Sequence, residues 1–478
     1  MNIQLKKFPH AIFRAYDIRG KVENLNHTVI RSIACAFANL FRSHQQDHVV
    51  LGYDARLSSP YLAYVIEKTL KEHQIAVMNI GCCSTPQLYF MTQQQQGNGI
   101  MITASHNPKS DNGFKWLLQG ESPSPEMIQQ LGRCAEGYAT EDCTTHDFLM
   151  QSYPMQHPLA AQCLHRYQDF ILQDIHLKKS FKVVLDGLHG SAGMSAQSLL
   201  QQLGCEVIAL RCLPNGHFPD HAPDPSQASH LRHLQQKILL HRADVGIALD
   251  GDGDRVVMLD EQGRILSADR LLALMSCICL EQHPQHEVVF DVKCSNMIGQ
   301  VVQKYAATAT MIRTGSTFLR KYIAHSKGKA VFGGEYAGHY VFNDGRGLGY
   351  DDGIYAALRV LEYWSQFSCN FSTLMAAYPE RYATEDTYIA TQGIAPQLVL
   401  QDFLREAQRF DAKLSTIDGV RLDFAHGFGI IRASNTGDFF TVRFDADSPA
   451  QLAEIRTCFS DLVKTNYPKL AAEILNAH

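Results

Sequence analysis

The chain has 478 residues, a formal net charge of −5, and 45% hydrophobic and 19% charged residues. This length predicts three domains of about 150 residues each, or four smaller ones, and the composition is ordinary for a soluble globular protein rather than a disordered one. The negative net charge disfavours a nucleic-acid-binding protein, which usually carries surplus Lys and Arg on one face. An anionic ligand would therefore need cations gathered locally.

Cysteine spacing and hydropathy favour a cytoplasmic protein. The 13 Cys lack the regular spacing of a disulfide framework and include no Cys-x-x-Cys pair, so neither a zinc ribbon nor a redox motif is predicted. A reducing cytosol fits this usage best. Residues 1–13 are followed by no apolar run long enough for a secretory signal. The longest such run, residues 271–280, is about half a membrane span, so we expect no membrane partner.

The first third of the chain alternates helix-like and strand-like segments. Residues 28–41 and 60–73 have helical periodicity, whereas short β-branched runs are typical of buried parallel strands. These runs are residues 48–54, 75–80 and 99–103. The first of them runs into the polar sequence Gly-Tyr-Asp-Ala-Arg at residues 52–56.

Charged or glycine-rich residues also follow short apolar runs further along the chain. These runs are residues 183–186, 245–249, 288–290 and 330–332. Open α/β sheets place their ligands at the carboxyl ends of their strands. Helical stretches, such as residues 193–203 and 269–280, separate the runs. The pattern predicts repeated α/β units, three in number.

The pattern changes after about residue 369. Three segments alternate like strands joined by short loops: residues 420–424, 429–433 and 439–444. Ser448 and Pro449 then have the character of an N-cap and a first-turn residue, so they predict the start of a helix. This region is expected to form a small α+β domain.

An isolated hydroxyl stands on a turn directly after the strand-like run at residues 99–103. Residues 103–108 read Thr-Ala-Ser-His-Asn-Pro, and Pro108 cannot donate a hydrogen bond to a sheet. The strand is therefore expected to end here, with the Ser105 hydroxyl pointing out of a rigid support. Seen alone, a Ser in this setting is most often an N-cap of a following helix. Other segments must decide between a cap and a reactive hydroxyl.

Asp250, Asp252 and Asp254 alternate with glycines. The glycines make this segment flexible enough to curl so that the three carboxylates bind one small hard cation. Without a cation, the three negative charges would repel one another. A hairpin turn explains one Asp-Gly pair but needs no three alternating Asp. A calcium EF-hand is the closer alternative, with Glu261 at its last ligand position. The EF-hand interpretation fails because Arg255 stands at the position where that loop needs Gly, and because the segments on either side of the loop look like strands rather than helices. Mg²⁺ is the expected ion.

A magnesium site together with a hydroxyl at a strand end predicts phosphoryl transfer, in which catalysis is mostly positioning and charge neutralisation. Ser105 would carry the phosphate covalently, and the metal would neutralise its charge. Ordinary serine hydrolases are disfavoured because no Gly-x-Ser-x-Gly surrounds Ser105. His106 is adjacent in sequence, which by itself does not make it a positioned base.

These residues resemble the α-D-phosphohexomutase superfamily, and most closely its bacterial phosphomannomutase/phosphoglucomutase branch. The resemblance runs over essentially the whole chain, and its motifs stand in the family's order. They are an opening loop at residues 13–20 (Phe-Arg-Ala-Tyr-Asp-Ile-Arg-Gly), the phosphoserine loop at 103–108, the magnesium loop at 250–255, a sugar-binding loop at 334–339 (Gly-Glu-Tyr-Ala-Gly-His) and a phosphate-binding loop at 432–436 (Arg-Ala-Ser-Asn-Thr).

The resemblance implies three similar α/β domains with mixed sheets plus a C-terminal α+β domain, arranged around a central cleft. The domains would span residues 1–150, 151–260, 261–368 and 369–478. It also implies an enzyme that interconverts hexose 1-phosphates and 6-phosphates, of mannose or glucose. Phosphoserine at position 105 would donate to the sugar, giving a 1,6-bisphosphosugar that turns over and returns its other phosphate.

Functional residues of the family carry over to the matching positions. One Mg²⁺ would be held by Asp250, Asp252, Asp254 and the phosphorylated Ser105. The implied catalytic residues are Ser105, Lys115 as the proton-transfer group, Arg19, His106 and Arg255. The implied substrate-binding residues are Tyr16, Lys293, Glu335, Tyr336, His339, Arg432, Ser434, Asn435 and Thr436. A hexose 1,6-bisphosphate would be the activator, and we expect a monomer or weak dimer.

Departures from the family pattern bear on sugar preference. Ser316 stands where the branch usually has His, Tyr336 and Ala337 replace the usual Met and Ser, and residues 187–190 read Gly-Leu-His-Gly instead of Gly-Asn-Gly. Preference between mannose and glucose phosphates is therefore open. One alternative is a phosphoglucosamine mutase, which the Ser-Asn-Thr phosphate loop disfavours. Another is a non-catalytic sugar-phosphate-binding protein, which the intact catalytic set disfavours.

Overall fold

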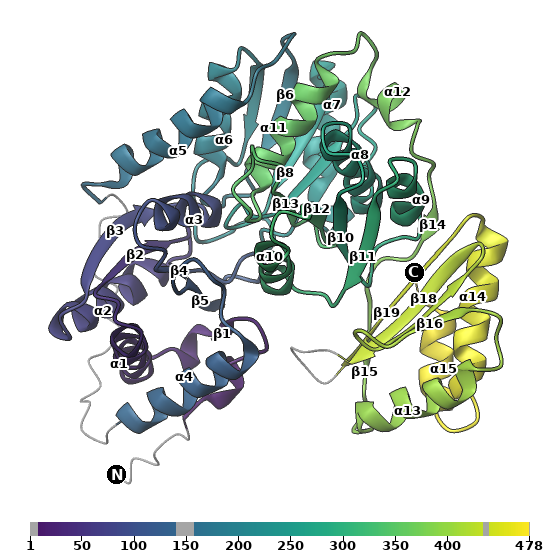
Figure 1. Ribbon diagram of the computed structural model, residues 1–478, viewed down its shortest axis with the longest axis horizontal. Coiled ribbons are helices and arrows are strands. Elements are labelled where there is room, and N and C mark those ends of the chain that lie inside the picture. Colours follow the sequence, from purple (N-terminus) through teal and green to yellow (C-terminus); the bar gives the residue numbers. More distant parts are fainter. Residues whose placement is uncertain (1–7, 140–156, 434–438, 478) are drawn as a thin grey trace. The chain divides into compact units, whose positions relative to one another are not determined.

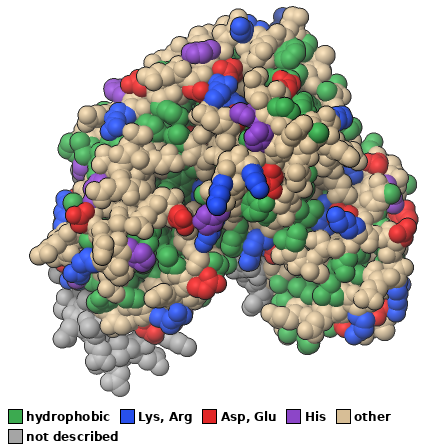
Figure 2. Space-filling model, viewed as in Figure 1, with side chains coloured by type: hydrophobic (Ala, Val, Ile, Leu, Met, Phe, Trp, Pro, Cys, Tyr) green, Lys and Arg blue, Asp and Glu red, His purple; other side chains and the backbone are tan. Residues whose placement is uncertain are grey.

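The computed structural model describes residues 8–139, 157–433 and 439–477 (Figure 1). The chain divides into two compact units, Met1–Leu266 with Ala337–Leu374, and Ser267–Tyr336 with Met375–His478. Within the described ranges, no helix combines the length and apolarity needed to cross a membrane. On the face drawn in Figure 2, Lys and Arg side chains are interspersed with Asp and Glu.

The first sheet of the first unit has the strand order β1-β5-β4-β2-β3. Its strands are β1 (Ile18–Lys21), β2 (His48–Tyr53), β3 (Ala76–Cys82), β4 (Gly99–Ile102) and β5 (Asp111–Leu117). Strand β2 runs parallel to β3 and β4, whereas β5 runs antiparallel to β4 and β1. The helices are α1 (His27–Ser43), α2 (Ser59–Glu72), α3 (Thr85–Gln93) and α4 (Pro125–Tyr138), with 3-10 turns η1 (His10–Ile12) and η2 (Val22–Asn24).

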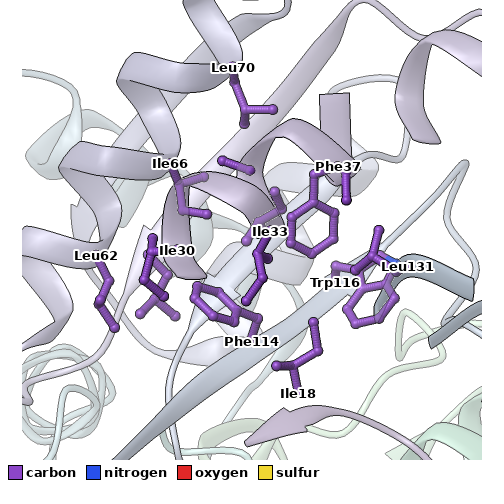
Figure 3. Packing of buried hydrophobic residues seen from close by; sticks show 14 of the residues in the cluster. Ile18, Ile30, Ile33, Phe37, Leu62, Ile66, Leu70, Phe114, Trp116 and Leu131 are labelled. Carbon is purple, nitrogen blue, oxygen red and sulfur yellow. The ribbon is translucent and has the colours of Figure 1, made fainter. Parts of the chain in front are cut away.

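Apolar side chains at helical spacing bury one face of α1 and one face of α2 against this sheet. The two helices contribute Ile30, Ile33, Phe37, Leu62, Ile66 and Leu70 to the cluster (Figure 3). Strand β5 contributes Phe114 and Trp116, and the rings of Phe37 and Trp116 meet edge to face with centroids 5.3 Å apart. Full burial of one such side chain contributes about 1.5–3 kcal/mol, so this core fixes the position of β5.

The second sheet of the first unit has the order β7-β6-β8-β9. Its strands are β6 (Lys182–Asp186), β7 (Glu206–Leu210), β8 (Val245–Leu249) and β9 (Val256–Leu259). Strand β6 is parallel to β7 and β8, and β9 is antiparallel to β8. The other elements are α5 (Ala160–Asp174), α6 (Gly193–Gln202), η3 (Ala228–Leu231), α7 (Arg232–His241), β13 (Tyr340–Phe342), α11 (Gly353–Trp364) and α12 (Phe371–Met375).

The second unit contains a parallel sheet with β10 at its centre. Strand β10 (Glu287–Asp291) pairs with β11 (Thr308–Ile312) and β12 (Ala330–Gly334). The helices of this part are α8 (Ala268–Leu280), α9 (Met297–Gln303) and α10 (Ser316–His325). The order β11-β10-β12 repeats the orders β3-β2-β4 and β7-β6-β8 of the first unit, so the same parallel arrangement occurs three times.

The last part of the second unit is an antiparallel sheet of order β14-β19-β18-β17-β16, in which β15 also pairs with β19. The strands are β14 (Tyr382–Ala383), β15 (Thr387–Ala390), β16 (Lys413–Ser415), β17 (Val420–Phe424), β18 (Gly427–Ala433) and β19 (Phe439–Ala446). The helices are α13 (Pro396–Ala407), α14 (Pro449–Val463) and α15 (Pro468–Leu475). Ser448 caps α14 by accepting from the Gln451 N–H, as the sequence predicts.

The fold class is confirmed: three α/β domains are followed by an α+β domain with an antiparallel sheet. The predicted strands after which polar residues stand are confirmed as well. Strands β4, β6 and β8 end directly before those residues, whereas β2, β10 and β12 extend one or two residues into them. Because carboxyl ends of parallel strands form the ligand-binding edge of such sheets, the polar residues stand where a site is expected. The boundaries near residues 150, 260 and 368 stay a prediction.

Candidate active site

Strand β4 leads directly into the loop that carries Ser105, and residues 103–105 of this loop are buried. Ser105 is 1% exposed and has a φ of 51°, in the left-handed region that residues other than glycine seldom adopt. The next element is strand β5 rather than a helix, so the interpretation as a helix cap is wrong. The expectation of an outward-facing hydroxyl is also wrong, because the loop that follows β8 covers this segment. A Cβ on Gly251 would lie only 2.5 Å from the Ser105 carbonyl oxygen.

The Ser105 hydroxyl faces an acid and an imidazole. Its Oγ donates to Asp250 Oδ2 over 2.7 Å and lies 3.3 Å from His106 Nδ1. Burial, followed by the charges of Arg255 and Arg19, holds the pKa of His106 well below its ordinary value. His106 is therefore a neutral imidazole beside the hydroxyl, within reach of a weak hydrogen bond.

The loop between β8 and β9 brings Asp250, Asp252 and Asp254 together, all completely buried. One oxygen of each carboxylate lies within 4.8 Å of the others. Gly253 has a φ of 76°, which glycine adopts without strain, and this allows the loop to curl. The Oδ1 atoms of Asp252 and Asp254 are buried without a hydrogen-bond partner. Such oxygens are costly unless something binds them, and their convergence fits a hard divalent cation.

Lys115 on β5 joins this acidic loop. Its Nζ donates to Asp252 Oδ2 over 2.7 Å and also to Asp254 Oδ2. Burial alone would lower the pKa of Lys115, but Asp252 and Asp254 raise it above its ordinary value. Burial would likewise raise the pKa of Asp252, but Lys115 holds it low. In contrast, burial and then its acidic neighbours raise the pKa of Asp250 well above its ordinary value. Lys115 is thus held as an ammonium ion.

Arg19, on β1, lies beside the loop that carries Ser105. Its Nη1 donates to Asn107 Oδ1 over 3.0 Å, and its Nη2 pairs with Asp17 Oδ2 at 2.6 Å. Tyr16 stands three residues before Arg19 and is half-buried. The opening loop therefore meets the serine loop through a charged side chain, as expected for residues that line one site.

Arg255 and His339 contact each other next to the acidic loop. Arg255 Nε donates to His339 Nε2 over 2.9 Å, and His339 Nδ1 lies 2.8 Å from Asp351 Oδ2. His339 is thus held between a guanidinium and a carboxylate, whereas the sequence predicts a contact to sugar hydroxyls. That role stays a prediction, and the structure adds a second one, the orientation of Arg255.

Among the described residues, the second unit holds four of the predicted substrate-binding residues, Lys293, Glu335, Tyr336 and Arg432. Lys293 follows β10, pairs with Asp386 Oδ2 at 2.6 Å, and lies 5.5 Å from the centre of the Tyr336 ring. Glu335 directly follows β12 and accepts a hydrogen bond from the Gly315 N–H. The side chains of Lys293 and Glu335 are buried, so each is fixed by a partner within its own unit.

Arg432 stands near the end of β18. Its Nη2 pairs with Asp418 Oδ2 at 3.0 Å, while its buried Nε has no hydrogen-bond partner. A guanidinium with a free buried donor is suited to a further anionic ligand. The neighbouring residues Ser434, Asn435 and Thr436 lie outside the described residues, so their predicted contacts to phosphate stay predictions.

The position with Ser in place of the usual His begins helix α10. Ser316 Oγ accepts from Arg320 Nη1 over 3.3 Å, one turn further along the same helix. The preceding Gly315 has a φ of 137°, a conformation that side chains rarely allow. The Ser316 hydroxyl is therefore tied to its own helix.

Comparisons with known proteins give the family. Profiles described as "Phosphoglucomutase/phosphomannomutase, alpha/beta/alpha domain I", "domain II" and "domain III" match residues 10–142, 165–263 and 267–382. A protein of Pseudomonas syringae pv. tomato, named phosphomannomutase/phosphoglucomutase, is 36% identical over 97% of this chain and 97% of its own. The chain belongs to the phosphoglucomutase/phosphomannomutase family. The predicted family membership is thereby confirmed.

Other members of the phosphoglucomutase/phosphomannomutase family are nearly as similar. A phosphoglucomutase of Neisseria gonorrhoeae is 34% identical over 95% of this chain and 97% of its own. The crystal structure of a family protein from Burkholderia thailandensis superposes with a TM-score of 0.87 at 31% identity, covering 97% of this chain and 99% of the other. The match is full-length in sequence and in fold.

Some contacts of this family site could not be read from the sequence. Thr85 Oγ1 donates to Asp252 Oδ2 over 2.7 Å, and Asp351 faces His339. Arg56 donates to the backbone of the serine loop. The only signal for Arg56 is the polar sequence at residues 52–56, which follows a buried strand as the other site segments do. No pattern marks Thr85.

Proposed function

We propose that this protein interconverts hexose 1-phosphates and hexose 6-phosphates, of mannose or glucose, through a phosphorylated Ser105 and a 1,6-bisphosphosugar intermediate. The observation that carries the proposal is the Ser105 hydroxyl 2.7 Å from Asp250 in a buried cluster of three carboxylates. Three buried carboxylates repel one another, so their grouping is costly unless a cation binds them. A serine with a purely structural role would need no such costly surroundings. The relatives named phosphomannomutase/phosphoglucomutase support the same reaction.

In each transfer, the bond between phosphorus and Ser105 Oγ breaks while a bond between phosphorus and a sugar hydroxyl oxygen forms. The sugar hydroxyl loses its proton, and Ser105 Oγ gains one. Lys115 is our proposed proton-transfer group: as an ammonium ion it can supply the proton to Oγ and regain one from the hydroxyl. The second transfer runs in the reverse direction, from the other phosphate of the turned sugar.

Asp250, Asp252 and Asp254, together with the serine phosphate, would hold one Mg²⁺. When bound, the ion supplies positive charge against the phosphate oxygens. The residues of this chain add further contacts: Arg19 donates to the serine loop, Arg255 ends the acidic loop and donates to His339, and Thr85 fixes Asp252. Hexose 1,6-bisphosphate as activator, a cytoplasmic location and a monomer or weak dimer belong to the same proposal.

The residues of the second unit would bind the part of the sugar phosphate that does not react. One phosphate site must serve either end of the sugar, so it should recognise phosphate without regard to the carbon that bears it. Arg432 has a buried donor free for such a contact. Glu335 and His339 are proposed for the sugar hydroxyls, with Tyr16, Lys293 and Tyr336 as further contacts.

A coupled turnover assay with glucose, mannose and glucosamine 1-phosphates tests this proposal. We expect turnover of glucose or mannose 1-phosphate to the 6-phosphate, dependent on Mg²⁺ and on a trace of hexose 1,6-bisphosphate. Faster turnover of glucosamine 1-phosphate would favour the amino-sugar alternative. No turnover of any of the three would contradict the mutase proposal and leave a sugar-phosphate-binding protein.

A further inference from the structure

Arg56, in the turn after β2, is among the largest completely buried side chains, with 1% exposure. Its guanidinium donates to four backbone carbonyl oxygens, all in the segment that carries Ser105. Nη2 donates to Ser105 O and Asn107 O, each over 2.7 Å. Nη1 donates to Pro108 O over 2.7 Å and to Asp111 O over 3.0 Å. One side chain thus satisfies four carbonyls of the irregular segment at residues 105–111.

The Asp54 carboxylate binds both the Arg56 guanidinium and the Thr103 hydroxyl. Its Oδ2 accepts from Arg56 Nε over 3.0 Å and from Thr103 Oγ1 over 2.8 Å. Its Oδ1 accepts from the Arg56 N–H and from Ser59 Oγ. The carboxylate therefore fixes both the arginine and the threonine that precedes Ser105.

The peptide groups around Ser105 are held on both sides. Thr103 Oγ1 accepts from the Ser105 N–H over 2.8 Å, and Arg56 Nη2 donates to the Ser105 carbonyl. Between these contacts Ser105 has its φ of 51°, a conformation that costs about 1–3 kcal/mol at functional sites and persists only where surrounding contacts enforce it. The two hydrogen bonds are the contacts that enforce it here.

We propose that Asp54, Arg56 and Thr103 form a positioning apparatus for the phosphate-carrying serine, which sets the direction of Ser105 Oγ toward Asp250. This inference rests on the proposed function. Arg56 touches no reacting atom in this arrangement, so it acts through the backbone of Ser105. Without the Arg56 side chain, the direction of Ser105 Oγ toward Asp250 is no longer fixed. A small misplacement of reacting groups costs about 10²-fold in rate.

The fork of the guanidinium is essential to this role. Four carbonyls converge on two nitrogens, and the planar fork of Arg meets them in a fixed geometry. Lys keeps the positive charge, but its N–H donors all lie on one nitrogen at the end of a flexible side chain. A substitution of Arg56 by Lys therefore separates charge from geometry.

The experiment compares Arg56→Lys with Arg359→Lys in the full-length protein. Arg359 is the matched control, because it is 2% exposed, lies in the same unit, and pairs with Asp344 Oδ2 at 2.6 Å. Three quantities are measured for each variant: the thermal midpoint, kcat and KM for glucose 1-phosphate, and the rate at which glucose 1,6-bisphosphate phosphorylates Ser105, followed by intact mass.

We expect Arg56→Lys to lower kcat and the rate of Ser105 phosphorylation by about 10²-fold, with KM changed less than about threefold. Arg359→Lys is expected to lower the thermal midpoint by a comparable amount and to keep kcat. If Arg56→Lys loses no more of kcat than Arg359→Lys does, or if its loss lies in KM, the positioning role is overturned.

Thr103 keeps the inference testable if Arg56→Lys fails to fold. Thr103→Val removes the hydroxyl that accepts from the Ser105 N–H, whereas Thr103→Ser retains it. We expect Thr103→Val to slow Ser105 phosphorylation at least tenfold and Thr103→Ser to recover most of that loss. Equal rates in the two variants overturn the inference alone. A wild-type protein that accepts no phosphate on Ser105 overturns the proposed function as well.

Discussion

The two units of the molecule hold their charged site residues in different ways. In the first unit the predicted catalytic groups contact one another, since Ser105 bonds to Asp250 and Lys115 bonds to Asp252 and Asp254. In the second unit each of the two predicted substrate-binding cations is paired with a separate carboxylate. Lys293 pairs with Asp386, and Arg432 pairs with Asp418.

This difference separates chemistry from binding. Groups that already touch one another are preorganised, so changes among them should act on the rate of the chemical step. A cation that already has a carboxylate partner must divide its hydrogen-bond donors between that partner and an anionic ligand. Changes among these cations should therefore act on affinity. Substitutions in the first unit should therefore lower kcat, and substitutions in the second should raise KM.

The largest effect is expected for Ser105→Ala. Removal of the group that carries the phosphate should lower turnover by about 10⁴-fold or more, because no other hydroxyl replaces it. The thermal midpoint should change little, since among the described residues the lost hydroxyl makes hydrogen bonds only to Asp250 and His106. Steady-state assays and thermal unfolding check both parts. A collapse of stability in this variant would support a structural role instead.

Removal of divalent cations should have the next largest effect. EDTA should abolish turnover, and added Mg²⁺ should restore it and raise the thermal midpoint, since ligand at 100 times its Kd stabilises the folded state by about 2.7 kcal/mol. Asp254→Asn should lose the magnesium-dependent shift, because it removes the charge of a carboxylate whose buried Oδ1 has no hydrogen-bond partner. Asp344→Asn, a buried acid paired with Arg359, should keep it. An equal shift in both variants would place the metal elsewhere.

Arg432→Ala tests the second unit. It should weaken substrate binding by about 1.5–3 kcal/mol, the contribution of a hydrogen bond to a charged group, seen as a higher KM for both the 1-phosphate and the 6-phosphate. Asp418→Asn should lower KM, because Arg432 loses its competing partner. Arg405→Ala, an exposed arginine of α13, serves as the control. An unchanged KM for both sugar phosphates in Arg432→Ala would remove Arg432 from the site.

The smallest effect concerns stability and pH in the first unit. Asp352 caps α11 and accepts from Tyr167 OH over 2.8 Å, and burial raises its pKa from 3.8 to about 7. Between these values the folded protein holds a proton that the unfolded chain releases, so this group's contribution to stability falls as pH rises through the interval. Asp352→Asn cannot titrate. Relative to that variant, the wild-type thermal midpoint should fall between about pH 4 and pH 7, and a constant difference would contradict this.

Much of the fold could be predicted from short-range patterns. Val245–Leu249 is β8 as predicted, and the helix at residues 28–41 is α1 with only its ends extended. These elements depend on periodicity and on residues that end a strand, both of which are local. The acidic loop was predicted for the same reason, because its three Asp lie within five residues.

The parts that could not be predicted depend on contacts between distant segments. Ser105 was expected to face solvent, but the loop around Gly251 covers it from about 145 residues away in sequence. In the sequence, nothing distinguishes Arg56 from other charged residues that follow a strand, because the carbonyl groups it contacts lie about 50 residues downstream. His339 was assigned to a sugar, and its contact with Arg255 spans 84 residues. Local pattern carries no information on such pairs.

Intact-mass analysis of the purified protein, with peptide mapping of the modified residue, is the most direct measurement of phosphate on Ser105. After incubation with glucose 1,6-bisphosphate and Mg²⁺, the chain should gain one phosphate, located on Ser105, and lose it again when excess glucose 1-phosphate is added. A chain that gains no phosphate, or gains it on another residue, would contradict Ser105 as the phosphate carrier.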